Sequence, residues 1–187
     1  MGESVMGEQD YIVRNADPFE FSEIGSLMVR VFSQVEGFPK ETEQPDYYKT
    51  LANIGEITKK PGAELLVAVD SENKIKGAVV YFSEMEYYGS GGIATKEQNT
   101  SGFRLLTVDP LVRGGGIGNL LVRECIRKAD DNRHDYMIIH TTVAMQTAWR
   151  LYEKQGFKRS EEFDFMQGEL PVLGFRLFLR NNKIPQR

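Results

Sequence analysis

Apolar residues recur along this chain at two spacings, and the changes between them predict an alternation of strands and helices. Residues 11–14 read as a short strand, and residues 21–35 then carry one apolar stripe at helical spacing. Asp17 and Pro18 are typical of a helix start, because they place a capping residue before a proline in the first turn. A second helix is predicted over residues 46–57, with apolar residues on one face.

The remainder of the chain favours strands that alternate with two further helices. Residues 64–69 and 75–85 predict an antiparallel hairpin across a polar turn. Further strands are expected at residues 103–108, 136–141, 157–165 and 172–179, the last two as a closing hairpin. Helices are expected after residue 116 and around residues 148–155. The resulting order, β-α-α-β-β-β-α-β-α-β-β, is that of a mixed α/β protein.

A strand, three consecutive glycines and an amphipathic helix follow one another without a break in the middle of the chain. Gly114, Gly115 and Gly116 lack side chains, so their backbone can approach phosphate oxygens closely. The first helical turn begins at Ile117 and Gly118, and its unpaired N–H groups point outward with the positive end of the helix dipole behind them. This arrangement is suited to binding a pyrophosphate.

Arg113 stands at the entrance to these glycines and adds a fixed positive charge with a planar set of donors. The spacing differs from that of a Walker loop, which requires Lys and then Ser or Thr where Asn119 and Leu120 stand. It also differs from the dinucleotide fingerprint, because Leu121 occupies the place of the last glycine. The loop therefore predicts a phosphate site of another kind, with a plain turn between strand and helix as the alternative.

A second motif lies about thirty residues farther on, where Ala148, Leu151 and Tyr152 occupy a short predicted helix. Gly156 fits the left-handed position that ends a helix, and Phe157 opens the next strand. The glycine loop and this helix together resemble the GNAT superfamily of acyl-CoA-dependent N-acetyltransferases. The helix matches the pattern Ala-x-x-Leu-Tyr-x-x-x-Gly-Phe of that family.

The glycine loop matches the other motif of the family, Arg-x-x-Gly-x-Gly, through Arg113, Gly116 and Gly118. The resemblance implies an α/β fold with a single mixed, mostly antiparallel sheet flanked by helices. In that family the fourth and fifth strands splay apart, and acetyl-CoA lies in the V between them. Free N–H and C=O groups at such strand edges can bind pantetheine as a short strand would.

The resemblance also implies roles for particular residues. Leu106, Thr107 and Val108 line the pantetheine, and residues 113–118 hold the pyrophosphate. An acetyl group passes directly from the thioester to a primary amine, with no covalent enzyme intermediate. The N–H of Val108 polarises the thioester carbonyl, and Tyr152 donates a proton to the departing thiolate. For Tyr152, the alternative is a helix aromatic that only packs and has a satisfied hydroxyl.

Two departures from the family pattern leave the proton acceptor unassigned. Met145 stands where many members have Asn, and residues 101–104 contain no carboxylate at the start of the fourth strand. Glu84, Glu86 and His140 are candidates for the base, as is a relay through water with no dedicated base. The other histidine, His134, reads as a surface residue in a polar turn.

Composition narrows the class of protein further. The chain has 187 residues and a formal net charge of −4, which favours one domain and argues against nucleic acid as a partner. Cys125 is the only cysteine, so we expect a buried core residue, no disulfide, no metal site and a reducing, cytoplasmic setting. No apolar run approaches a membrane span, and residues 1–10 do not resemble a signal peptide.

Several alternatives stay open from the sequence. A catalytically degenerate acyl-CoA-binding or sensing module is the main competitor of an enzyme, and an α/β domain that binds ATP through the glycine loop is a more distant one. The acceptor amine is unidentified. Its pocket is expected to be formed in part by residues 87–101 and 167–174, and four tyrosines are candidates to line it: Tyr47, Tyr48, Tyr87 and Tyr88. A mildly acidic surface suits a cationic acceptor, and homodimerisation is left open. Trp149 is expected to pack on the core.

Overall fold

The computed structural model describes residues 10–180, which fold around one eight-stranded sheet. The strands lie in the order β1-β2-β3-β4-β5-β8-β6, and β7 pairs with β8. The strands are β1 Ile12–Asn15, β2 Ala63–Val69, β3 Ile75–Phe82, β4 Thr100–Val108, β5 Tyr136–Thr141, β6 Lys158–Arg159, β7 Phe165–Gln167 and β8 Leu170–Phe178. The helices are α1 Phe21–Ser33, α2 Pro45–Ala52, α3 Ile117–Asp131 and α4 Gln146–Lys154.

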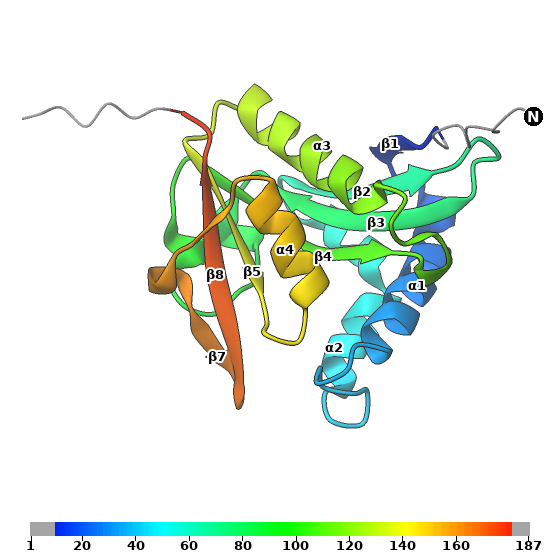
Figure 1. Ribbon diagram of the computed structural model, residues 1–187, viewed down its shortest axis with the longest axis horizontal. Helices are drawn as coiled ribbons and strands as arrows, with labels where there is room; N and C mark the ends of the chain where they lie inside the picture. The colour runs from blue at the N-terminus through cyan, green and yellow to red at the C-terminus, as the bar shows by residue number, and fades with distance from the viewer. Residues whose placement is uncertain (1–9, 181–187) are drawn as a thin grey trace, which may run out of the picture.

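The predicted fold class is confirmed. Every strand pair in the sheet is antiparallel except β4 with β5, and helices cover both faces. In Figure 1, α3 lies above the central strands, whereas α1 and α2 lie below them. The side chains of α4 join the core on the α3 side of the sheet.

Two apolar cores, one on each face, hold the helices to the sheet. On β2, Leu65 and Val67 pack toward α1 and α2, whereas Leu66 and Ala68 pack toward α3. All four side chains are buried, because successive side chains of a strand point to opposite faces. Helices on both faces thus explain why this strand is apolar at every position from Leu65 to Val69 rather than at alternate ones.

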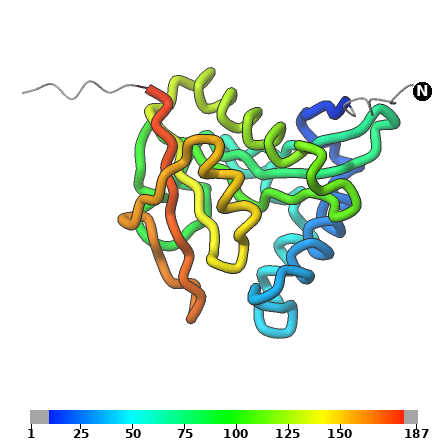
Figure 2. Tube along the Cα trace, viewed as in Figure 1, coloured from blue at the N-terminus to red at the C-terminus, as the bar shows by residue number. Residues whose placement is uncertain are grey.

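The sheet divides after a short parallel contact between β4 and β5. Only three residue pairs join these strands, from Thr100 opposite Tyr136 to Gly102 opposite Ile138. Beyond Gly102, β4 continues to Val108 beside β3, while β5 continues to Thr141 beside β8. Figure 2 shows the traces of the two strands, green and yellow, moving apart. The expected splaying of the fourth and fifth strands is therefore confirmed.

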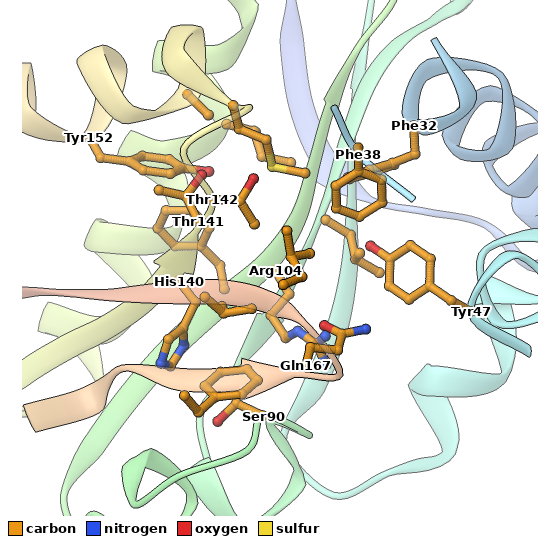
Figure 3. Close-up of a pocket in the computed structure, with 18 of the residues that line it drawn as sticks. Phe32, Phe38, Tyr47, Ser90, Arg104, His140, Thr141, Thr142, Tyr152 and Gln167 are labelled. Atoms are coloured by element: carbon orange, nitrogen blue, oxygen red, sulfur yellow. The ribbon is translucent and has the colours of Figure 1, made fainter. Parts of the chain in front are cut away.

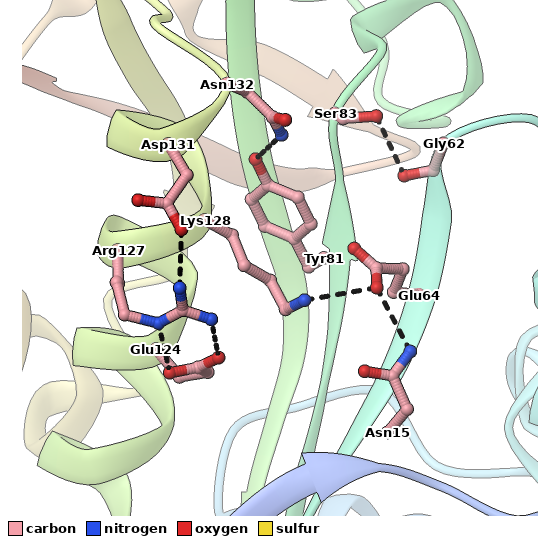
Figure 4. Close-up of polar contacts among 10 residues, drawn as sticks. All are labelled: Asn15, Gly62, Glu64, Tyr81, Ser83, Glu124, Arg127, Lys128, Asp131 and Asn132. Carbon is pink, nitrogen blue, oxygen red and sulfur yellow. Dashed lines mark hydrogen bonds and ion pairs between the residues drawn. The ribbon is translucent and has the colours of Figure 1, made fainter.

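Polar contacts fix α3 across the face of β2 and β3 (Figure 4). The ammonium group of Lys128 lies 3.1 Å from a carboxylate oxygen of Glu64, which also accepts a hydrogen bond from Asn15 at 3.0 Å. One turn later, the amide of Asn132 donates to the hydroxyl of Tyr81 at 3.1 Å. These contacts lie near the C-terminal end of α3, and they set the direction in which its N-terminus points.

Three predicted boundaries are wrong in instructive ways. The predicted helix over residues 46–57 ends at Ala52, and a 3-10 turn from Ile54 to Lys59 follows it. Gly55 lets this turn pack closely against α1, since a Cβ on it would lie 2.2 Å from the ring of Phe21. The third strand ends at Phe82 rather than at residue 85, and the connection over residues 87–101 contains a 3-10 turn and the first two residues of β4.

The predicted strand over residues 157–165 is the third wrong boundary, because it is broken into β6, a 3-10 turn and β7. The carboxylate of Asp164 causes the break by accepting hydrogen bonds from the backbone N–H of Gly174 at 2.7 Å and from Arg159. The backbone of Gly174 therefore bonds to the side chain of Asp164, and the hydrogen bonds between the strands do not continue as one regular ladder.

Single-residue expectations are mostly confirmed. Cys125 is fully buried, and Trp149 packs edge-on against Phe175 with ring centroids 5.0 Å apart. The surface assignment of His134 is wrong: it is 8% exposed where the chain passes from α3 into β5.

The expectation that residues 1–10 do not form a signal peptide is not tested, because residues 1–9 lie outside the described part of the chain. Within residues 10–180, no helix is long and apolar enough to cross a membrane.

A buried ion pair ties β1 to the entrance of α1 and generates a prediction about stability. Glu20 is 4% exposed, and its carboxylate accepts bonds from Arg14 at 2.8 and 2.9 Å and from the backbone N–H of Asp17 at 2.8 Å. The bonds from Arg14 lower the pKa of Glu20. A carboxylate with a lowered folded pKa stabilises the protein above its unfolded pKa, and this stabilisation is lost as pH falls through the folded pKa.

We expect Glu20→Gln to lower the free energy of unfolding by about 1–3 kcal/mol near pH 7. The difference from the wild type should shrink below about pH 4, where the unfolded carboxyl takes up a proton before the folded one does. Urea unfolding at a series of pH values measures both quantities. Glu23→Gln, on the exposed side of α1, is the matched control and should change little. A difference that stays constant down to pH 3 would contradict the assignment.

Candidate active site

The glycine loop forms an open backbone cradle at the start of α3. Gly114 and Gly116 have φ angles of +84° and +83°, and a Cβ on either would meet nothing within 4 Å. Gly116 precedes the first helical residue, and no side chain among the described residues caps this helix end. The first N–H groups of α3 are therefore available to an anion, with the positive end of the helix dipole behind them.

Asp109 holds the loop in place from its strand side. Its carboxylate accepts a hydrogen bond from the N–H of Leu111 at 3.0 Å, and its own N–H donates to the carbonyl of Lys76 at 2.8 Å. Arg113 is exposed beside the glycines, and no ion pair is formed by it within residues 10–180. The loop thus presents donors and one positive charge to solvent.

A bulge in β4 shapes the strand just before this loop. Ala78 lies opposite Thr107 and Val80 lies opposite Arg104, so β4 carries one extra residue between these pairs. Leu105 takes up the extra length with a φ of +61°, a left-handed conformation that costs a non-glycine residue about 1–2 kcal/mol. The hydroxyl of Thr107 donates to the carbonyl of Leu105 at 2.8 Å and stabilises the bulge.

The hydrogen-bond pattern of β4 directs the N–H of Val108 into the gap. The N–H of Asp109 bonds to β3, and adjacent residues of an antiparallel pair alternate between bonded and non-bonded positions. The N–H of Val108 therefore points away from β3, toward the edge of β4 that β5 has left. No strand in the described part of the chain pairs with that edge beyond Gly102.

A cavity of about 100 Å³ lies where β4 and β5 separate (Figure 3). Its walls come from the end of α1, the loop that follows, α2, the bulge of β4, the end of β5, α4 and the β7–β8 hairpin. Two of the residues expected to bind the cofactor or take part in catalysis line it, Leu106 from β4 and Tyr152 from α4. The cavity therefore joins the gap between the strands to the α1–α2 side of the molecule.

Tyr152 is a buried residue of the cavity wall. It is 5% exposed, and its ring reaches from α4 toward the cavity, packed edge-on against Phe103 and Phe157 (Figure 3). Its hydroxyl accepts or donates no hydrogen bond among the described residues, so the packing alternative with a satisfied hydroxyl finds no support. Burial raises the pKa of the Tyr152 phenol, which keeps it protonated at neutral pH.

His140 lies in the cavity wall with both ring nitrogens engaged. Its Nε2 lies 2.8 Å from the carbonyl of Phe163, and its Nδ1 lies 2.9 Å from the hydroxyl of Tyr88. A carbonyl can only accept, so Nε2 carries the proton and Nδ1 accepts from Tyr88. Burial lowers the pKa of His140 to about 4, so the ring is neutral. As arranged here, it has no free lone pair for an amine.

The glutamate candidates for the base lie elsewhere. Glu84 and Glu86 are exposed, and neither lines the cavity. Met145 does line it, just before the first residue of α4. Of the four tyrosines considered for an acceptor pocket, Tyr47 and Tyr88 line the cavity. The other two, Tyr48 and Tyr87, do not.

The sequence interpretation missed several polar residues that the fold brings into this cavity. Arg104 enters from the bulge of β4, and Ser90, Thr141 and Thr142 contribute buried hydroxyls with no hydrogen-bond partner among the described residues. Arg104 stands in a strand of otherwise uncharged residues, which is the one local signal that it differs from its neighbours. Nothing in the sequence indicates toward which face of the sheet the side chain of Arg104 points.

Comparisons with known proteins agree with this geometry. The model of the Acetyltransferase (GNAT) family matches residues 26–157, which is most of the chain. The chain therefore belongs to the GNAT acetyltransferase family. It is therefore an acetyltransferase of that family.

Solved structures share the fold at low sequence identity. A GNAT-family acetyltransferase from Staphylococcus aureus Mu50 superposes with a TM-score of 0.70 at 16% identity, covering 91% of this chain and 100% of that one. The Salmonella typhimurium protein yncA, solved with its cofactor acetyl-CoA, has a TM-score of 0.64 at 15% identity, covering 95% and 98%. A spermidine N-acetyltransferase SpeG chimera from Vibrio cholerae and hSSAT has a TM-score of 0.62 at 18% identity, covering 90% and 95%.

A curated relative matches over a shorter stretch. N-acetylaspartate synthetase from Danio rerio is 36% identical over 67 residues, which are 36% of this chain. The match spans about a quarter of the relative, 24% of its length. It therefore describes a shared segment and not a shared whole protein.

The state of His140 is directly measurable. Because burial lowers its pKa to about 4, its ring signals should not titrate between pH 5 and 8 in the folded protein. With only two histidines in the chain, His134→Gln assigns the NMR signals of the pair. Folded His140 binds its proton less readily than unfolded His140, so this residue should reduce stability as pH falls from about 6.5 toward 4. A titration midpoint near 6.5 would contradict the buried, neutral ring.

Proposed function

We propose that this acetyltransferase moves the acetyl group of acetyl-CoA directly to a primary amine bound in the cavity. The observation that carries the proposal is the free edge of β4, which is followed by a 3-10 turn over Pro110–Val112 and then by the glycine loop. Along that edge Leu106, Thr107 and Val108 bind the pantetheine by backbone hydrogen bonds, in the manner of an added strand. Residues 113–118 hold the pyrophosphate against the N-terminus of α3.

In the reaction, the amine nitrogen attacks the thioester carbonyl carbon, and the carbon–sulfur bond then breaks. The N–H of Val108, directed into the gap, stabilises the negative charge that develops on the carbonyl oxygen. The protonated phenol of Tyr152 donates to the departing thiolate, so that CoA leaves as a thiol. A fixed backbone donor and a buried phenol together supply the two charge-stabilising groups that the transfer requires.

The amine must reach the carbonyl as a neutral nucleophile, and its proton must leave. No carboxylate lines the cavity among the described residues, and both nitrogens of His140 are occupied. The proton therefore leaves through water, one of the routes left open by the sequence.

Two relatives point to acceptors of opposite charge. The name of the zebrafish relative refers to an acetylated acidic amino acid, whereas spermidine is a polycation. From family membership we infer only that the acceptor is an amine. The charge of the acceptor has to be inferred from the residues that line the cavity.

Thermal unfolding with and without acetyl-CoA, and with ATP and magnesium as a control, tests the cofactor site. Acetyl-CoA at about a hundred times its Kd should add roughly 2.7 kcal/mol, while the ATP arm should show no shift.

Gly116→Ala tests the glycine cradle. An added methyl group at a φ of +83° both strains the loop and enters the space assigned to the pyrophosphate. We expect the Kd for acetyl-CoA, measured by calorimetry, to rise about tenfold or more, equivalent to at least one lost charged hydrogen bond. Gly168→Ala is the matched control, since Gly168 also has a positive φ and nothing within 4 Å but lies in the β7–β8 turn. Equal loss of affinity in both variants would reject the cradle.

Tyr152→Phe tests the proton donor. The ring and its packing are kept, so acetyl-CoA affinity should stay within about twofold while kcat falls roughly a hundredfold. Tyr87→Phe serves as the control, because that phenol lies outside the cavity wall and its removal should leave kcat unchanged. Unchanged turnover in Tyr152→Phe would remove this residue from the mechanism.

A further inference from the structure

Arg104 is a cation held in the cavity wall without an anionic partner. Its Nη1 donates to the backbone carbonyl of Tyr88 at 3.0 Å, and its guanidinium carbon lies 5.7 Å from the centre of the Tyr88 ring. Neither contact neutralises its charge, and no carboxylate in the described part of the chain forms an ion pair with it. Four of its five N–H donors have no partner among the described residues.

The rest of the cavity wall does not supply the missing negative charge. The residues that line it are apolar, aromatic or neutral polar, and Arg104 is the one that carries a charge, since His140 is neutral. Arg104 is half-buried, so apolar walls replace part of the water around its charge, and an anion beside it would be stabilising. The cavity therefore suits a ligand that brings an anion to Arg104.

Neutral donors and acceptors line the same cavity. The hydroxyls of Ser90, Thr141 and Thr142 are buried without partners, and Gln167 also lines the cavity (Figure 3). The amide nitrogen of Gln167 donates to Gln44 at 3.1 Å, which fixes the amide and leaves its carbonyl oxygen unused. Unpartnered hydroxyls near a cation suit a small ligand with both acceptor and donor groups.

We propose that the acceptor amine carries a carboxylate, and that Arg104 binds this carboxylate while Tyr152 and the edge of β4 receive the amine side. Free amino acids are the smallest ligands of this kind, and their size suits a cavity of about 100 Å³. The inference rests on the proposed function, because it names the acceptor class for that same site. It also replaces the expectation of a cationic acceptor from the mildly acidic overall charge, since the cavity is locally positive.

The guanidinium is well suited to this task. Its planar set of donors can bind both oxygens of one carboxylate, whereas a neutral amide offers one acceptor and repels through its own N–H groups. The bond from Nη1 to Tyr88 holds the side chain in one direction, and Tyr88 is in turn fixed by His140. Arg104 is therefore positioned before the acceptor arrives, which reduces the entropy lost on binding.

The test measures CoA thiol release with acetyl-CoA and a panel of acceptors. The panel contains the common L-amino acids, the C-terminal amide of each, spermidine, and phenylethylamine as an amine without a carboxylate. We expect at least one free amino acid to be acetylated with a kcat/KM about a hundredfold above that of its amide. Arg104→Gln should lower kcat/KM for the amino acid about a hundredfold, mainly by raising KM, and should change the value for its amide less than threefold.

Four further measurements separate carboxylate binding from a structural role. The Kd for acetyl-CoA and the thermal midpoint of Arg104→Gln show whether the fold and the cofactor site are intact. Arg104→Lys keeps the charge but loses the planar geometry, so it should recover part of the preference for the acid over the amide. Arg123→Gln, on the exposed side of α3, removes a surface charge of the same kind and should leave the preference unchanged.

The outcomes distinguish failure of this inference from failure of the proposed function. Equal use of acids and their amides, use of spermidine or phenylethylamine alone, or an equal loss for acid and amide in Arg104→Gln would overturn the carboxylate assignment and leave amine acetylation standing. Release of CoA with no member of the panel, although acetyl-CoA binds, would overturn the proposed function and this inference together.

Discussion

The loss of pairing between β4 and β5 after Gly102 is the constraint on which the rest of this structure depends. A sheet that stayed paired would bury both strand edges in hydrogen bonds and leave no place for another extended chain. Here β4 stays with β3, β5 stays with β8, and helices from both faces close around the opening. The free edge, the cavity and the approach to the glycine loop all follow from that separation.

Local strain and buried polar groups gather where the strands part. The left-handed Leu105 makes room for one extra residue in β4, and the unpartnered hydroxyls of Thr141 and Thr142 end β5 across from it. Both features cost stability in the empty protein, and two well-packed apolar cores offset that cost. The opening is therefore maintained by the surrounding sheet and not by its own contacts.

Both sides of the opening between β4 and β5 present a positive charge. The glycine loop presents N–H groups and Arg113 to the cofactor phosphates, while the cavity presents Arg104 and a neutral His140 to the acceptor. No negative charge among the described residues lines the cavity between them. An arrangement of this kind attracts anions from either side. The acidic overall composition therefore says nothing about the sign of the charge at the reaction centre.

The sequence by itself determined the features that depend on short-range geometry. The β2–β3 hairpin, α1, and the glycine loop leading into α3 follow from hydrophobic spacing and from residues that favour turns, and the motifs around Gly116 and Tyr152 carried the family resemblance. Only the tertiary structure decided which polar groups meet. Arg104 and His140 reach Tyr88 across 16 and 52 residues of sequence, and the bulge depends on the register between two strands. Such contacts are set by how the strands pair and pack, which no local pattern of residues encodes.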